Sequence, residues 1–213
     1  MERTATLLLV GATGLVGRHV LETALAEPRV SRVVAPTRRP LLEQAKLSAP
    51  LVDFENLPAA ADWWRADAVI CTLGTTMRAA GSQDAFRRVD YDYPLVVAQR
   101  AYSAGTPVYV LNSAIGANAN SRFFYNRVKG ELENALADIG FDSLTFVRPG
   151  LIGGQRVEVR AGERLMAAAL MVAAPLLPRR WRVNPAPKIA RALLEAALSA
   201  PPGRHVVGAA QLV

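Results

Sequence analysis

Three glycines near the N-terminus restrict the fold more than any other feature of this chain. Gly11, Gly14 and Gly17 are spaced as G-x-x-G-x-x-G, after the apolar run 7–10 and before a helical pattern. Gly11 permits a tight turn, Gly14 lets a phosphate approach the backbone, and Gly17 allows close helix–strand packing. Free N–H groups at a helix start favour phosphate binding. The sequence therefore predicts a dinucleotide-binding loop, and a glycine turn without a ligand is the alternative.

Short apolar runs alternate with helical patterns along the rest of the chain. Such an alternation predicts an α/β fold, with a Rossmann-type doubly wound parallel sheet. We expect Pro94 to start or kink the third helix, because proline has no N–H to donate. The expected strands are 5–10, 32–36, 51–53, 68–73, 107–112 and 143–148, and the expected helices are 15–27, 59–65, 83–104 and 123–139.

The chain after residue 154 has a different pattern. An apolar helix over 162–177, a helix over 188–200 and a strand near 205–207 are expected. No linker divides the chain, so we expect a single domain, 1–213, in which 153–186 is a short C-terminal lid. The apolar helix would pack on the sheet or on a second subunit of a homo-oligomer. Alternatively, it would form an apolar wall over the ligand.

Composition excludes several classes of protein. One cysteine and two histidines argue against a disulfide and against a metal site. The net charge of +7 is scattered rather than gathered in a stripe, which argues against nucleic-acid binding. The longest apolar stretch, 165–177, is too short to span a bilayer, and no secretory signal is present. A cytoplasmic protein without an integral membrane segment is therefore expected.

Tyr125 and Lys129 are the strongest candidates for chemistry. Residues four apart share one face of a helix, so the phenol and the ammonium can contact the same ligand. A nearby ammonium lowers the pKa of a phenol, which can then exchange a proton near neutral pH. Ser113, at the end of an apolar run, would polarise a carbonyl. The trio is typical of hydride transfer with a nicotinamide, whereas an ordinary amphipathic helix is the alternative.

The residues after the second expected strand bear on the choice of cofactor. NAD sites often carry an acid there for the ribose 2′-hydroxyl. This chain instead has Thr37, Arg38 and Arg39, which suit a 2′-phosphate. The sequence therefore favours NADP(H) over NAD(H). The alternative is a solvated turn, which Arg39 fits better than Arg38.

Together these residues resemble the atypical branch of the short-chain dehydrogenase/reductase superfamily. More narrowly, the chain is similar to the Tat-interacting-protein oxidoreductases and to bacterial nucleoside-diphosphate-sugar epimerase-like proteins. The resemblance covers nearly the whole chain. It rests on GATGLVG (11–17), VDFE (52–55), CTLGTT (71–76), FRRVD (86–90), NS (112–113), YNRVKGE (125–131) and VRPG (147–150).

The resemblance implies an NADP(H) site and a role for each matching residue. Ser113, Tyr125 and Lys129 match the catalytic trio of the family, with Tyr125 as proton donor or acceptor. Asp53 and Phe54 would flank the adenine, although Asp53 could instead cap the following turn. The residues expected to contact the cofactor are Gly11, Ala12, Thr13, Gly14, Leu15, Val16, Thr37, Arg38, Arg39, Asp53, Phe54, Leu73, Gly74, Thr75, Tyr125, Lys129, Pro149, Gly150, Leu151 and Ile152.

Three functions agree with this pattern. The first is an NADP(H)-dependent oxidoreductase that acts on a small or apolar carbonyl or alcohol. The region after Gly150 is short, which disfavours a bulky nucleotide-sugar substrate. The second is an NADP(H)-binding regulatory or scaffold protein with little turnover. The third is an isomerase or epimerase with a tightly bound cofactor.

Overall fold

A computed structural model describes residues 4–153 and 182–213 of the chain. The expected apolar helix 162–177 and most of the expected lid, 153–186, lie outside the described residues. No described helix combines the length and the apolar character needed to cross a bilayer.

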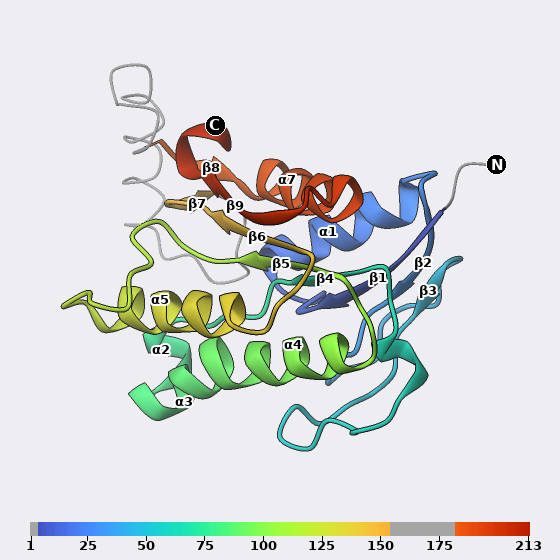
Figure 1. Ribbon diagram of the computed structural model, residues 1–213, viewed down its shortest axis with the longest axis horizontal. Coiled ribbons are helices and arrows are strands. Elements are labelled where there is room, and N and C mark those ends of the chain that lie inside the picture. The colour runs from blue at the N-terminus through green and yellow to red at the C-terminus, as the bar shows by residue number, and fades with distance from the viewer. Residues whose placement is uncertain (1–3, 154–181) are drawn as a thin grey trace.

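The centre of the protein is a parallel sheet of seven strands (Figure 1). Its order is β3-β2-β1-β4-β5-β6-β9, and every neighbouring pair runs parallel. The Rossmann-type doubly wound fold expected from the sequence is therefore confirmed. The strands are β1 (Ala5–Val10), β2 (Val30–Val34), β3 (Leu47–Ser48), β4 (Ala68–Cys71), β5 (Val108–Asn112), β6 (Ser143–Arg148) and β9 (Gly203–Gly208).

Helices cover both faces of the sheet (Figure 1). On one face α1 (Leu15–Ala26) packs beside α7 (Ala186–Ser199), and on the other lie α4 (Tyr93–Ser103) and α5 (Phe124–Ala137). Alternate residues of the central strands enter the two cores, as when Leu7 and Leu8 of β1 bury on opposite faces. Burial on both sides explains why the strands read as continuous apolar runs.

The long helix expected over 83–104 is built from three pieces. α3 (Gln83–Arg87) runs into a π-helical turn, Arg88–Asp92, and α4 begins at Tyr93. Pro94 lies in the first turn of α4, as expected, directly after the π-helical turn. The short helix α2 (Met77–Ala80) precedes this region.

Other boundaries differ from the sequence-based expectation. The third strand forms at Leu47–Ser48, whereas the expected strand 51–53 contributes only a bridge between Leu51 and Thr37. Pro50, which has no N–H, limits pairing there. The helix expected over 59–65 is a 3₁₀ turn, Asp62–Trp64. Beyond the sheet, β7 (Ile152–Gly153) pairs with β8 (Asn184–Pro185).

Candidate functional site

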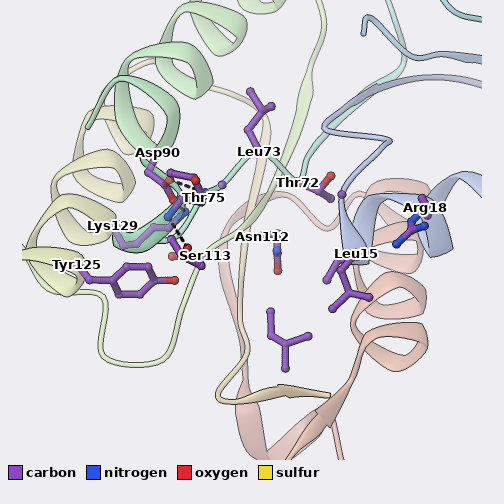
Figure 2. A pocket seen from close by; sticks show the side chains of 16 residues that line it. Leu15, Arg18, Thr72, Leu73, Thr75, Asp90, Asn112, Ser113, Tyr125 and Lys129 are labelled. Atoms are coloured by element: carbon purple, nitrogen blue, oxygen red, sulfur yellow. Dashed lines mark hydrogen bonds and ion pairs between the residues drawn. The ribbon is translucent and has the colours of Figure 1, made fainter. Parts of the chain in front are cut away.

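A cavity of about 380 Å³ opens at the carboxyl ends of the central strands (Figure 2). It lies where chain connections leave β1 and β4 in opposite directions, the point at which doubly wound sheets bind ligands. Helix α1 begins at one side of the cavity and α5 borders the other. The expected site residues that line it are Gly14, Leu15, Val16, Leu73, Gly74, Thr75, Ser113, Tyr125, Lys129 and Ile152.

The glycine loop leaves the start of α1 open towards this cavity. Gly11 has a φ of +90°, and a Cβ there would lie 2.7 Å from Thr72. A Cβ on Gly17 would lie 2.1 Å from the carbonyl oxygen of Gly11. Gly14 caps α1, and a Cβ there would meet only that carbonyl oxygen, at 3.3 Å. Two of the glycines therefore allow close packing, and the third leaves space for a ligand at the helix N-terminus.

Lys129 forms a buried ion pair at the opposite side of the cavity. Its Nζ lies 2.8 Å from Oδ1 of Asp90, and the two side chains are only 4% and 1% exposed. The other oxygen of Asp90 accepts a hydrogen bond from the Thr75 N–H at 2.7 Å. Burial alone would lower the pKa of Lys129, but the charges of Asp90 and Tyr125 outweigh it and raise that pKa. Asp90 therefore joins Lys129 to the loop that follows β4.

Sequence reasoning assigned no role to Asp90, although a signal was available. Asp90 lies four residues after Phe86, which is fully buried, and four before Pro94, so it occupies the buried stripe of the helical pattern. A carboxylate at such a position needs a partner. The π-helical turn holds Asp90 at the centre of this region, and such turns frequently occur at functional sites.

A second buried carboxylate holds Ser113. The Ser113 hydroxyl donates to Oε1 of Glu133 at 2.5 Å, and Ser113 and Glu133 are each 4% exposed. Arg148 donates to both oxygens of Glu133, with Nε 3.0 Å from Oε1. Glu133 lies four residues after Lys129 and eight after Tyr125, so the three share one face of α5. Sequence reasoning missed Glu133, although the repeated spacing of four pointed to it.

Tyr125 projects into the cavity from the first turn of α5 (Figure 2). Its ring packs against Phe86, with centroids 5.6 Å apart, and 38% of the residue is exposed. The structure thus brings the predicted trio of Ser113, Tyr125 and Lys129 to the lining of one cavity.

Asn112 also lines the cavity, and sequence reasoning assigned it no role. Its Oδ1 is buried and has no hydrogen-bond partner among the described residues. Such an atom is unfavourable unless a ligand or water donates to it. Figure 2 shows Asn112 between the start of α1 and Ser113. With the open helix start and the space at Gly14, this polar group fits an elongated ligand such as a dinucleotide.

The residues expected at the adenosine end lie outside this cavity. The Thr37 hydroxyl donates to the carbonyl of Arg39, and Arg38 and Arg39 are exposed without an ion-pair partner among the described residues. Asp53 accepts the Glu55 N–H and an Asn56 amide N–H, which lower its pKa.

The remaining expected residues lie in three separate parts of the structure. Phe54 is buried against Tyr93, with ring centroids 5.7 Å apart. Ala12 and Thr13 line a smaller hollow of about 200 Å³ beside α1, and Gly11 packs closely against Thr72.

In the last expected segment, residues 149–152, Ile152 lines the cavity, whereas Leu151 is 57% exposed. The Pro149 carbonyl accepts a hydrogen bond from the Ile115 N–H, and the Gly150 N–H donates to Oδ1 of Asn184.

Comparison with known proteins identifies relatives along most of the chain, although no family model matches. The mitochondrial protein fmp52 of Emericella nidulans is 39% identical over 179 residues, or 78% of this chain and 76% of that protein. Its counterpart in Aspergillus fumigatus is 36% identical over 93% of this chain and 92% of that protein. Protein HTATIP2 of Rattus norvegicus is 38% identical over 75% of this chain and 68% of that protein.

Solved structures share the fold at low sequence identity. MoeE5 in complex with UDP-glucose and NAD has a TM-score of 0.73 and 18% identity, over 95% of this chain and 76% of that chain. A putative NAD-dependent epimerase/dehydratase from Bacillus halodurans has a TM-score of 0.67 and 17% identity, over 98% of each chain.

The names of the fungal relatives correct one expectation. These relatives are named as mitochondrial proteins, so the prediction of a cytoplasmic protein is wrong. That prediction rested on the missing secretory signal and the short apolar stretch. Neither observation distinguishes the cytoplasm from the mitochondrion.

Proposed function

This chain belongs to the family of the fungal FMP52 proteins and HTATIP2, and we propose that it is an NADP(H)-dependent oxidoreductase of small or apolar carbonyl or alcohol compounds. One observation carries the proposal. The open N-terminus of α1 and the pair of Tyr125 and Lys129 lie on opposite sides of one cavity. A dinucleotide that places its phosphates at the helix would bring its nicotinamide end towards the phenol.

Different residues of the cavity would bind different parts of the cofactor. The N–H groups that follow Gly14 suit the pyrophosphate, because they have no partner within the helix. Lys129 and the loop around Thr75 suit the nicotinamide ribose, and Asn112 offers an amide to a nearby polar group. When bound, the nicotinamide would supply or accept the hydride.

Tyr125 would exchange the proton in this reaction. In reduction its phenol donates to the substrate oxygen, and in oxidation its phenolate accepts from the alcohol. Lys129 stabilises the phenolate by its positive charge. Asp90 keeps Lys129 charged and in place, since the ion pair offsets the cost of burying the ammonium.

The preference for NADP(H) is part of the same proposal. Arg38 and Arg39 follow β2, where the adenosine ribose would lie, and both are free of ion pairs within the described ranges. Two guanidinium groups there favour a 2′-phosphate.

A regulatory or scaffold protein that binds NADP(H) with little turnover is the second candidate. It is favoured by the hydrogen bond from Ser113 to Glu133, because that hydroxyl proton is directed away from a substrate. An isomerase would use the same cofactor site without net consumption of NADPH.

A screen of carbonyl compounds with NADPH, and of alcohols with NADP⁺, tests the proposal. Tyr125→Phe should lower kcat about 10²- to 10⁴-fold, the usual contribution of a general acid or base. Binding of NADPH should be largely retained, since the phenol is one contact among many. Tyr102→Phe is the matched control, because Tyr102 packs on Phe141 away from the cavity. Undiminished turnover in Tyr125→Phe would reject the assignment.

A further inference from the structure

The hydrogen bond between Ser113 and Glu133 fixes the direction of a hydroxyl at the edge of the cavity. A serine hydroxyl has one proton to donate and two lone pairs that accept. Ser113 donates its proton to Glu133 over 2.5 Å, and both residues are 4% exposed. A carboxylate only accepts, so this direction is not reversible while Glu133 is ionised. The oxygen of Ser113 therefore has only lone pairs left for the cavity that it lines.

Arg148 holds the Glu133 carboxylate in the position that accepts from Ser113. It donates to both oxygens of Glu133 from the end of β6, so the carboxylate is held between a serine and a guanidinium. Hydrogen bonds to an ionised group are shorter and stronger than those between neutral groups. Turning the Ser113 hydroxyl into the cavity would replace one of these bonds by a weaker one.

We propose that Glu133 is a positioning residue that makes Ser113 a hydrogen-bond acceptor, and that the substrate carries a hydroxyl next to its reacting carbonyl carbon. The inference rests on the proposed function and specifies its substrate class. Tyr125 donates to the carbonyl oxygen, while the neighbouring hydroxyl of the substrate donates to Ser113. Figure 2 shows Ser113 and Tyr125 bordering the same part of the cavity, as two adjacent substrate oxygens require.

The reaction balances with the groups already named. The carbonyl carbon gains a hydride from NADPH, which carries two electrons, and the carbonyl oxygen gains the proton of Tyr125. The products are a vicinal diol and NADP⁺, and Tyr125 regains its proton from water. A ketone without the adjacent hydroxyl would place no donor against Ser113, so it would be the poorer substrate.

Neutron diffraction of the deuterated protein tests the direction of the hydroxyl, both free and with NADP⁺. The Ser113 deuteron should point to Glu133 in both forms. A deuteron that points into the cavity would overturn the proposal, as would a Tyr125 hydroxyl that donates to Ser113. This arm gives its answer without any turnover.

Acetoin and butanone, which differ by one hydroxyl, test the substrate class. With NADPH, kcat/KM should favour acetoin roughly tenfold, about the worth of one hydrogen bond. The ratio should approach one in Ser113→Ala. The ratio should also fall in Glu133→Gln. The amide of that variant can donate to Ser113, so the Ser113 hydroxyl proton can point into the cavity. Glu131→Gln, a change on the same helix at a residue paired with Arg87, should keep the wild-type ratio.

The outcomes separate the two proposals. Equal use of acetoin and butanone, or a preference that survives in Ser113→Ala, would refute the acceptor role while leaving the oxidoreductase intact. No turnover of either compound would count against the proposed function, and the neutron structure would still decide how Ser113 is directed.

Discussion

The two ends of the cavity are built in different ways. At the start of α1 the backbone forms the site, and the three glycines matter for the atoms that they lack. Along α5 side chains form the site, and two buried carboxylates hold them: Asp90 with Lys129, and Glu133 with Ser113. The backbone end is set by seven consecutive residues, whereas the side-chain end needs partners from β5, β6 and the π-helical turn. Substitutions that change charge should be tolerated at the backbone end. At the side-chain end, substitutions that change volume should be tolerated better than those that change charge.

Asp90→Asn should show the largest effect at the side-chain end. The variant leaves the ammonium of Lys129 buried without its anionic partner, which typically costs about 3–5 kcal/mol in the free energy of unfolding. Denaturant unfolding measures the loss. Asp92→Asn is the matched control, since Asp92 is an exposed residue of the same π-helical turn. Equal losses in both variants would show that the ion pair has no special role.

Gly17→Ala tests the backbone end. The added Cβ would lie 2.1 Å from the carbonyl oxygen of Gly11, so the backbone must shift, at a cost of roughly 1–3 kcal/mol. Gly14→Ala should cost less stability, because its Cβ would approach the same oxygen no closer than 3.3 Å. It should nevertheless weaken NADPH binding, since the methyl group enters the ligand side. The reverse order of stabilities, followed by thermal unfolding, would contradict the packing described for this loop.

Replacement of both arginines after β2 tests the cofactor preference. In Arg38→Gln with Arg39→Gln, the dissociation constant for NADPH should rise tenfold or more, about the worth of a charge-assisted hydrogen bond. The constant for NADH should stay unchanged, because NADH has no 2′-phosphate. Calorimetric titration with both cofactors gives the two constants. Equal dissociation constants for NADH and NADPH in the wild-type protein would contradict the proposed preference for NADP(H).

Titration of Lys129 should have the smallest effect on the free energy of unfolding at neutral pH. Its pKa is raised in the folded protein, where the charge and hydrogen bond of Asp90, together with Tyr125, outweigh the lowering effect of burial. The stability from the pair is therefore complete below the unfolded pKa, about 10.4, and is lost as pH rises through the folded value. Unfolding measured across alkaline pH should show this loss in the wild type but not in Lys129→Met. The same alkaline slope in both proteins would mean that Lys129 contributes nothing to it.

The fold could be predicted because its signals are local. The strands of β1 and β4 to β6 are short apolar runs, and the turn at Gly11 follows one of them directly. The edge strand β3 was misplaced because only two residues pair there, and Lys46 before it adopts a positive φ of 65°. A strand so short leaves almost no pattern in the sequence.

The candidate site could be predicted only in part, for the same reason. Tyr125 and Lys129 are four residues apart, so their shared face follows from helical geometry. Asp90 reaches Lys129 across 39 residues of chain, and the π-helical turn that holds it there has no clear sequence signal. Glu133 continues the spacing of Tyr125 and Lys129, but its partner Ser113 comes from a different element. The sequence therefore predicted the members of the site, whereas the pairing of the two carboxylates with residues of other elements could not be predicted.

A crystal structure of the protein with NADP⁺ tests the central claim most directly. The pyrophosphate should lie against the N–H groups that follow Gly14, and the nicotinamide should lie between Tyr125 and Ile152, with its ribose near Lys129. A cofactor bound elsewhere, or turned so that its adenine lies beside Tyr125, would contradict the account.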